Sequence, residues 1–197
     1  MSPDGAPLDG AGPVHHLGPG VIERVASTEA PQPVLAVFRL RSPSLPPGAD
    51  FVIVADALGD PGNAGTIIRS AEGSGAQAVV LTPGSVDAFN PKVVRASAGS
   101  LFRVPVVSCD LATVRAAGLR VLATSSHRGT VYTDTDLTGP VAVVVGNEAR
   151  GVPDDTPVDG WLTIPQAGAE SLNVAMAATV LAFEVARQRR GQVESRR

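Results

Sequence analysis

The sequence predicts an α/β protein in which a parallel sheet carries helices on both faces. The first observation is that aliphatic segments of strand length alternate with helical segments from Phe51 onward. The second is composition, because 44% of the 197 residues are hydrophobic while only 4% are aromatic. The core must therefore consist of Val, Ala, Leu and Ile, and buried parallel strands read as aliphatic runs of this kind.

Two segments give the strongest strand signals, and one gives the longest helix signal. FVIVAD (51–56) and PVAVVVGNE (140–148) are short aliphatic runs that end in polar residues. The helical pattern runs from Ser171 to about Arg190, and Ser171 is its expected N-cap. In chain order we expect strands at 51–56, 78–83, 104–108, 118–124, 140–148 and 161–165, and helices at 63–75, 91–99, 110–117 and 171–190.

The N-terminal part of the chain has a different composition. Residues 1–20 are rich in Gly, Pro and Ala and are expected to be a flexible lead-in. VIERVAS (21–27) predicts a short helix and PQPVLAVFRL (31–40) a strand, before SPSLPPG (42–48) acts as a linker. Because about twenty ordered residues cannot enclose a core, we expect 21–48 to be the remnant of a larger domain plus a linker.

Composition also excludes several classes of protein. No apolar run reaches the ~18 residues that span a bilayer, and the N-terminus lacks the regions of a signal peptide. The single cysteine, Cys109, excludes an internal disulfide framework, so a cytoplasmic location is expected. The three histidines have no metal-ligand spacing, so no metal site is expected. A formal net charge of −3 argues against a surface that is basic all over, although a local basic face remains compatible with it.

The ends of parallel strands are where ligands collect in such sheets. Here those ends are Asp56, Thr124, the segment Gly146–Glu148 and the loop after Ile164. Three groups of residues that could bind a ligand or take part in catalysis lie at or just beyond these strand ends.

The first group is DPGNAGTIIRSAEGSGA (60–76). We interpret Gly62, Asn63 and Gly65 as a tight strand-to-helix turn, with Arg69 one to two turns into the helix. Glycines at such a turn let the backbone approach a ligand, and a helix N-terminus attracts anions. A tight turn with an exposed arginine is the alternative interpretation, since neither a G-x-G-x-x-G motif nor the lysine of a P-loop is present.

The second group is VVVGNEARGVPDD (143–155). Here an aliphatic strand runs directly into Gly146 and Glu148, and Gly146 would permit close backbone approach to a flat ligand. Alternatively, Glu148 is only a carboxylate that caps the following turn.

The third group is IPQAGAESLNVAMAA (164–178), a loop with Glu170 as its one charge that leads into a helix of small residues. Small side chains let another helix or backbone approach closely, so a packed interface is one interpretation. An ordinary buried helix within one chain is the other.

Together these groups resemble the SpoU family of RNA 2′-O-ribose methyltransferases, part of the SPOUT superfamily. The first family motif, N-x-G-x-x-x-R-[ST]-A, matches Asn63 through Ala71, and the second, G-x-E-x-x-G, matches Gly146 through Gly151. The third, I-P-x-x-G-x-x-x-S-L-N-V-x-x-A, matches Ile164 through Ala177 with a loop one residue shorter after Gly168. The resemblance covers about 51–190, and we assign 49–192 to the methyltransferase domain and 193–197 to a tail.

The resemblance implies a deep trefoil knot at the C-terminal end, which no periodicity predicts because true knots are rare. It implies S-adenosylmethionine bound in the knot and a homodimer whose interface lies beside the cofactor. By similarity, the cofactor contacts Thr124, Gly146, Ile164, Leu172 and Asn173. The catalytic residues are, by similarity, Arg69, Asn63, Glu148, Ser171 and Asn173.

The implied reaction is attack of a ribose 2′-oxygen on the sulfonium methyl group. An arginine is a poor base because its pKa exceeds about 12, so we favour electrostatic stabilisation by Arg69 over proton abstraction. Phosphate contacts are expected from Lys92, Arg95, Arg103 and Arg150, whose alternative is ordinary solvated charge.

The N-terminus departs from many relatives that modify ribosomal RNA, which carry a complete substrate-binding domain. Val21–Leu40 resembles only the last part of such a domain. Ribosomal RNA is the expected substrate, with transfer RNA as the alternative, because the motifs encode chemistry and not target. A non-catalytic RNA-binding relative and a nicotinamide-dependent enzyme are the other hypotheses, and the last is disfavoured because no G-x-G-x-x-G follows the first strand.

Overall fold

The structure is a computed structural model that describes residues 13–26, 29–37, 39–40 and 42–195. The chain divides into two compact units, Met1–Arg41 and Ser42–Arg197. In the first unit, α1 (Val21–Val25) confirms the predicted short helix. Residues 1–12 of the expected lead-in lie outside the described part of the chain.

The strand predicted at 31–40 is wrong for its described residues, which form no strand. A strand is stable only when neighbouring backbone groups satisfy its N–H and C=O groups. Within the described residues no strand lies beside segment 31–40 to pair with its backbone, and Val37 is 91% exposed. The apolar composition of the segment predicted a structure that only a larger sheet would support.

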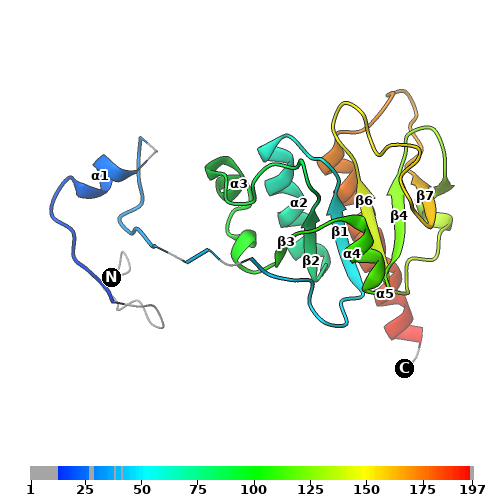
Figure 1. Ribbon diagram of the computed structural model, residues 1–197, viewed down its shortest axis with the longest axis horizontal. Helices are drawn as coiled ribbons and strands as arrows, with labels where there is room; N and C mark the ends of the chain where they lie inside the picture. The colour runs from blue at the N-terminus through cyan, green and yellow to red at the C-terminus, as the bar shows by residue number, and fades with distance from the viewer. Residues whose placement is uncertain (1–12, 27–28, 38, 41, 196–197) are drawn as a thin grey trace. The chain divides into compact units, whose positions relative to one another are not determined.

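The second unit contains a parallel sheet of seven strands, in the order β3-β2-β1-β6-β4-β7-β5 (Figure 1). Every pairing between these strands is parallel. The strands are β1 (Phe51–Ala55), β2 (Ala78–Leu81), β3 (Val106–Ser108), β4 (Arg120–Thr124), β5 (Thr130–Val131), β6 (Val141–Val145) and β7 (Gly160–Thr163). Six of them confirm predicted strands, and β5 was missed because two residues are too few to give a periodic pattern.

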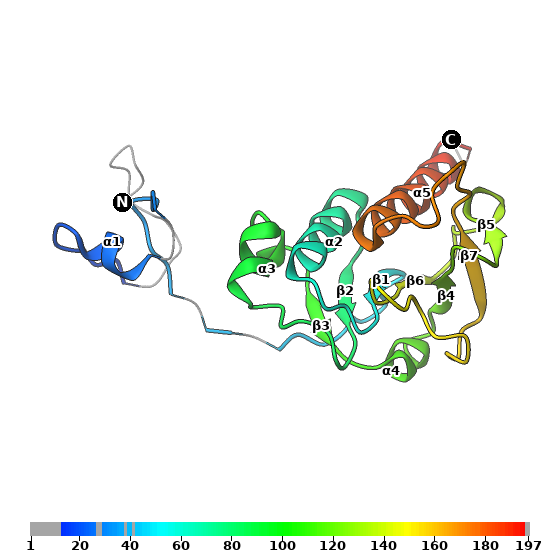
Figure 2. The same cartoon turned by 90° about the horizontal axis from the view of Figure 1, so that it is seen from above.

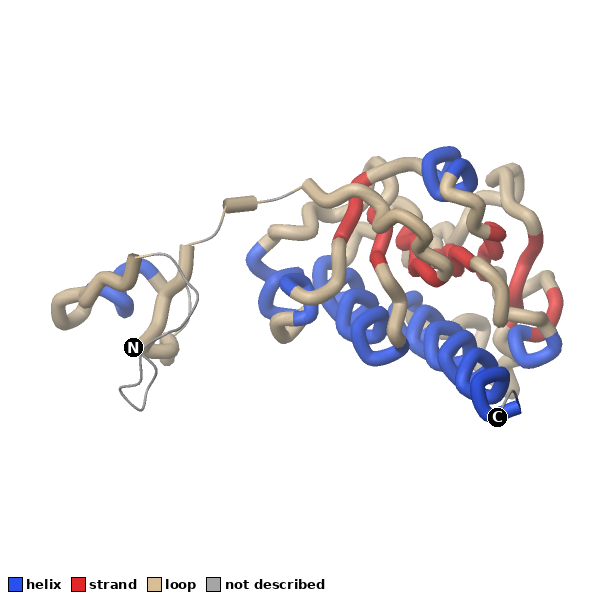
Figure 3. The backbone as a smooth tube through the Cα atoms, turned by 90° about the horizontal axis from the view of Figure 1, so that it is seen from below, coloured by secondary structure: helices blue, strands red, loops and turns tan. Residues whose placement is uncertain are grey.

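Helices cover both faces of this sheet, as predicted. They are α2 (Pro61–Ser74), α3 (Pro91–Ala96), α4 (Leu111–Ala116) and α5 (Val174–Ser195), with short 3₁₀ turns η1 (Ser100–Phe102) and η2 (Tyr132–Asp134). Figure 2 shows α2, α3 and α5 on one face and α4 on the other. The long helices α2 and α5 contact each other and run side by side in Figure 3.

The alternation of side chains along β1 builds a separate core on each face. Phe51 and Ile53 belong to the cluster that also contains Ile67 and Leu181, from α2 and α5. Val52 and Val54 belong to the opposite cluster, which contains Val114 from α4. Because every residue of β1 and β6 is buried, both strands lack the polar face of an exposed sheet.

The N-terminus of α2 corrects one prediction. Gly62, Asn63 and Gly65 lie inside the helix and not in a turn before it, because Asp60 caps the helix by accepting from the Asn63 N–H at 2.7 Å. A Cβ at Gly65 would lie 2.4 Å from the Ala96 Cβ. This glycine therefore permits close packing of α2 on α3, and not approach to a ligand.

The N-terminus of α5 corrects another. The helix begins at Val174, and Ser171 is outside it. The Asn173 Oδ1 atom accepts from the N–H groups of Ala175 at 2.9 Å and Met176 at 3.3 Å. Asn173 is therefore the N-cap in place of Ser171, since asparagine is as good a cap as serine and stands next to the first helical residue.

The strand order decides where a ligand can bind. The chain leaves β4 and forms β5 before it returns as β6, which inserts between β1 and β4. As a result, the carboxyl ends of β1, β6, β4 and β7 lie next to one another at one edge of the sheet. The three groups of residues identified in the sequence all follow these strand ends.

Candidate active site

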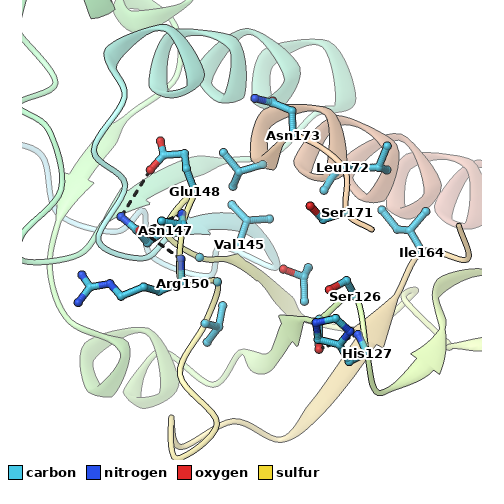
Figure 4. A pocket seen from close by; sticks show the side chains of 18 of the residues that line it. Ser126, His127, Val145, Asn147, Glu148, Arg150, Ile164, Ser171, Leu172 and Asn173 are labelled. Atoms are coloured by element: carbon cyan, nitrogen blue, oxygen red, sulfur yellow. Dashed lines mark hydrogen bonds between the residues drawn. The ribbon is translucent and has the colours of Figure 1, made fainter. Parts of the chain in front are cut away.

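A cavity of about 500 Å³ lies at this edge of the sheet. Its walls come from the ends of β4, β6 and β7 and from the segment that precedes α5. Figure 4 shows Glu148, Asn147 and Arg150 on one side of the Val145 side chain and Ser171, Leu172 and Ile164 on the other. Its volume lies within the ~300–1,000 Å³ of small-molecule and cofactor sites.

Gly146 fixes the wall that follows β6. A Cβ at this position would lie 2.1 Å from the carbonyl carbon of Gly151, because the loop folds back across the end of the strand. The backbone closes this loop with hydrogen bonds between Asn147 and Gly151, at 3.2 and 2.8 Å. Gly146 therefore allows the chain to approach itself, which corrects the expectation that a flat ligand is what requires the glycine.

A polar relay joins the three sequence motifs. The Asn63 Nδ2 atom donates to Glu148 Oε1 at 3.1 Å, and the Asn173 Nδ2 atom donates to Asn63 Oδ1 at 3.1 Å. Each motif contributes one member, although the three residues come from distant parts of the sequence. The same Asn173 caps α5 through its Oδ1 atom, so both ends of its amide are engaged.

The carboxylate of Glu148 also holds the loop that leads into α2. It accepts from the N–H groups of Asp60 at 2.9 Å and Gly59 at 3.3 Å. Desolvation raises the pKa of Glu148, but hydrogen bonds from its own backbone, from the Asn63 amide and from these two N–H groups outweigh it, and the net pKa lies below the ordinary value. Glu148 is therefore held as an ionised acceptor.

Asn147 completes this anchoring, and the sequence prediction gave it no role. Its Nδ2 atom donates to the Ala57 carbonyl at 2.9 Å, and its Oδ1 atom accepts from the N–H groups of Ala149 and Arg150. Ala57 has a φ of 50°, an unfavourable left-handed conformation for a residue with a Cβ. Because Asn147 stands between the two matched positions of the G-x-E motif, that proximity was the only signal available.

The structure gathers most of the predicted site residues around the cavity. All of the predicted cofactor contacts line it, namely Thr124, Gly146, Ile164, Leu172 and Asn173. Two more of the predicted catalytic residues, Glu148 and Ser171, line it as well. Asn63 does not, but it reaches the cavity through the relay.

Arg69 is the exception. It lies on α2, is exposed and does not line the cavity. Among the described residues its guanidinium makes no hydrogen bond or ion pair. The structure therefore separates the predicted catalytic arginine from the predicted cofactor contacts of the same chain.

Other lining residues were not predicted. They include Ser125, Ser126 and His127 in the loop after β4, and Gln166, whose Nε2 atom donates to the Ile164 carbonyl at 2.9 Å. Asp154 also lines the cavity, and it pairs at 2.7 Å with Arg128, whose guanidinium lies 3.7 Å from the centre of the Trp161 ring. Polar residues after a strand were the only signal for this loop, and they are common in loops of every kind.

The four basic residues expected at phosphates differ in their surroundings. Arg103 is engaged by Glu72, with 3.1 Å between Nη2 and Oε2, although its side chain is 59% exposed. Lys92 and Arg95 are exposed on α3, and Arg150 is exposed at the cavity. Only the last of these lies where it can contact a ligand of the cavity.

The α5 helix carries three buried alanines and three exposed larger apolar side chains, besides the core residues Leu181 and Val185. Ala175, Ala178 and Ala182 are at most 3% exposed, and they pack within the same chain. Met176, Val180 and Phe183 are 61%, 36% and 44% exposed. The small residues therefore serve the core of their own chain, and the larger side chains form an exposed face on α5.

This exposed face continues into a surface groove beside the relay. The groove is lined by Asn63, Thr66, Asn173, Ala175, Met176, Thr179 and Val180. Asn173 thus borders the cavity on one side and the groove on the other. Anything that fills the groove will contact the relay.

The described residues contain neither a metal-binding cluster nor a membrane-spanning helix. No group of His, Cys, Asp or Glu side chains within them is arranged to hold a metal ion. Within the same residues, no helix combines the length and the apolar character that crossing a membrane requires.

Comparison with known proteins identifies the family. The model of the SpoU rRNA Methylase family matches residues 50–183. The 23S rRNA (guanosine(2553)-2'-O)-methyltransferase RlmP of Bacillus subtilis is 39% identical, over 86% of this chain and 71% of the relative. The 23S rRNA (uridine(2479)-2'-O)-methyltransferase of Streptomyces viridochromogenes is 36% identical, over 86% of this chain and 65% of the relative.

Solved structures agree with this result. The AdoMet complex of the SpoU methyltransferase AviRb from Streptomyces viridochromogenes has a TM-score of 0.68 and 36% identity, over 75% of this chain and 64% of that one. The AdoMet-bound rRNA methyltransferase from Sinorhizobium meliloti has a TM-score of 0.69 and 36% identity, over 75% and 61%. The chain thus spans about two thirds of the length of these proteins. Because the family model covers more than half of the chain and its motifs meet in one site, the chain belongs to the SpoU rRNA methylase family.

Proposed function

We propose that this chain transfers a methyl group from S-adenosylmethionine to a ribose 2′-hydroxyl of ribosomal RNA. The observation that carries the proposal is the convergence of the three motifs on one cavity through the Glu148–Asn63–Asn173 relay. Relatives named as 23S rRNA 2′-O-methyltransferases support the choice of ribosomal RNA over transfer RNA. Such a substrate also supports a cytoplasmic location, where ribosomes work.

The cavity fits S-adenosylmethionine in size and in chemistry. Its walls combine apolar side chains, such as Ile164 and Leu172, with hydroxyl groups and exposed backbone of the loops. Adenine and ribose need N–H and C=O partners within an apolar slot. Thr124, Gly146, Ile164, Leu172 and Asn173 would hold the cofactor, which supplies the activated sulfonium methyl group.

The protein's tasks are alignment and stabilisation of charge, because the sulfonium is already a good leaving group. Glu148, Asn63 and Asn173 fix the two loops and the start of α2 in one arrangement. Ser171 lines the cavity beside them and can orient the ribose. Arg69 stays protonated and stabilises the negative charge that develops on the 2′-oxygen or on a neighbouring phosphate.

We further propose that the chain works as a homodimer that buries the exposed α5 face. Met176, Val180 and Phe183 give this face an apolar centre that a second copy would cover. Arg69 lies on α2, which packs beside α5, and it does not reach the cavity of its own chain. A second copy docked in the groove would let the arginine of one chain complete the cavity of the other.

The trefoil knot also belongs to this proposal. Insertion of β6 between β1 and β4, followed by return of the chain through 164–173 to α5, supports a knotted C-terminal region. A knot would hold the segments around the cavity in register, because no end can open without threading the chain back.

We propose in addition that 21–48 contributes what remains of a substrate-binding domain.

Methyl transfer tests the proposal directly. The chain is incubated with radiolabelled S-adenosylmethionine and either total ribosomal RNA or total transfer RNA, and calorimetry measures cofactor binding. We expect label in ribosomal RNA at the 2′-oxygen and none with Arg69→Ala. Cofactor binding without label in either RNA would support the non-catalytic alternative, and tighter binding of NAD would support the nicotinamide alternative.

A further inference from the structure

The corner formed by α3 and η1 exposes an aromatic ring that the proposed site does not use. Phe102 is 60% exposed, although its neighbours Leu101 and Val104 are 8% and 6% exposed. Ala98 and Gly99 both have positive φ values, 48° and 87°, and they reverse the chain between α3 and η1. This turn buries Leu101 while it leaves Phe102 at the surface.

The same corner carries unpaired positive charge. Lys92 and Arg95 are exposed on α3 and, among the described residues, neither forms a hydrogen bond or ion pair through its side chain. The acidic residues of segment 61–107 are Glu72, which is engaged by Arg103, and Asp87. In a chain whose net charge is −3, this segment is therefore locally basic.

The corner adjoins the arginine that the proposed reaction requires. Gly65 packs against Ala96 of α3, and Glu72 pairs with Arg103 just after η1. Arg69 lies between them on α2, because Gly65, Arg69 and Glu72 are spaced i, i+4, i+7 and residues so spaced share one side of a helix. Figure 2 shows α3 beside α2 in agreement with these contacts.

We propose that this corner binds single-stranded RNA next to the target nucleotide, with a base stacked on Phe102 and phosphates held by Lys92 and Arg95. The inference rests on the proposed RNA methylation and adds the surface that holds the substrate. Every base has a π-face that can stack on an aromatic side chain, and cations follow the backbone. Unpaired cations beside an aromatic ring fit RNA better than they fit an apolar partner, which would have to desolvate the charges.

The ring is tested by substitution of Phe102 in the full chain. Labelled fragments of total ribosomal RNA serve as the probe, and the Kd and the KM for RNA are measured together with the Kd for S-adenosylmethionine. Phe102→Ala is expected to raise the RNA Kd about tenfold, as loss of one stacked base does. Phe102→Trp should restore binding to within about twofold, whereas Phe102→Leu should not, because leucine is apolar but has no π-face. The cofactor Kd should stay at the wild-type value in all three.

The charges are tested by the salt dependence of RNA binding. Lys92→Gln and Arg95→Gln should each lower the slope of log K against log salt by about one. Arg190→Gln removes an exposed cation from the far part of α5 and should leave the slope unchanged. The spatial separation of α3 and the end of α5 in Figures 1 and 2 makes this a matched control.

The outcomes distinguish this inference from the proposed function. If wild type methylates ribosomal RNA but Phe102→Ala binds RNA as well as wild type does, the surface is overturned and the function stands. If Phe102→Leu binds as well as Phe102→Trp, an apolar contact with another partner replaces stacking. If wild type binds the RNA through this corner but transfers no methyl group, the enzymatic function fails and the surface stands.

Discussion

The cavity adjoins the exposed face formed by Met176, Val180 and Phe183 of α5 together with Arg69 of α2, but the two regions are built in opposite ways. Around the cavity, loops of one chain are held by side chains of the same chain, and Glu148, Asn63 and Asn173 leave little freedom there. On the exposed face, Met176 and Phe183 are turned outward, and Arg69 has no partner within the described residues. The first region is held in one arrangement by its own chain, whereas the second leaves apolar and charged side chains at the surface, as the proposed homodimer requires.

The largest effect is expected at Arg69. Replacing it with Ala should lower kcat for methyl transfer by about 10²–10³-fold, the loss typical when one stabilising donor is removed. The cofactor Kd should not change, because Arg69 does not line the cavity. Arg190→Ala, which also removes an exposed and unpaired arginine, is the control for net charge. Weakened cofactor binding by Arg69→Ala would mean that the two regions are one site.

Gly146 tests the other region. A Cβ here would meet the Gly151 backbone at 2.1 Å, so Gly146→Ala should destabilise the fold by about 1–3 kcal/mol and weaken cofactor binding. Gly139→Ala is the matched control, since no heavy atom lies within 4 Å of its added Cβ. Urea unfolding and calorimetry measure the two effects. Wild-type cofactor affinity in the Gly146 variant would show that this loop does not shape the site.

Phe183→Ser tests whether the exposed face is a dimer interface. The phenyl ring contacts the position where a Cβ would stand on Gly73 and is 44% exposed, so a polar replacement should cost the monomer little and weaken a dimer. Sedimentation should show a dimer for wild type and a larger monomer fraction for the variant. Phe102→Ser, at a ring that is 60% exposed and lies on η1, should leave the dimer intact. A monomeric wild type would remove the proposed second half of the site.

The smallest effect concerns pH. Because the folded state lowers the pKa of Glu148 below its usual value of 4.5, the stability that this carboxylate contributes is present above that value. It is lost as the pH falls through the lower folded-state pKa. Compared with Glu148→Gln, wild type should therefore lose more stability between neutral and acid pH in urea unfolding. Parallel pH profiles for the two proteins would contradict the relay.

The sequence predicted the cavity better than it predicted the helix ends. Gly146, Leu172 and Asn173, which we expect to contact the cofactor, all line the cavity, and each belongs to a motif that is read directly from the residue order. The cap of α5 was assigned to Ser171 because both Ser171 and Asn173 are good caps, and only the backbone decides between them. Asn147 was missed because its partner, the Ala57 carbonyl, is brought near by the sheet and not by sequence spacing.

The strand predicted at 31–40 illustrates a different limit. Its apolar residues satisfied the pattern of a strand, but a pattern on one segment does not supply the neighbour that its backbone requires. The position of Arg69 outside the cavity also depends on tertiary packing, which a sequence motif does not describe. The motif singles out Arg69, but its distance from the predicted cofactor contacts depends on the packing of α2 against α5, which the motif does not contain.

The most direct test of the central claim mixes two inactive variants. Arg69→Ala keeps a complete cavity but lacks the arginine, and Leu172→Trp fills the cavity but keeps the arginine. Each variant alone should transfer almost no methyl group to ribosomal RNA. If the arginine of one chain completes the cavity of the other, unfolding and refolding the two together should restore activity in the mixed dimers, which then contain one complete site. A mixture as inactive as its separate parts would contradict completion of the site by a second copy.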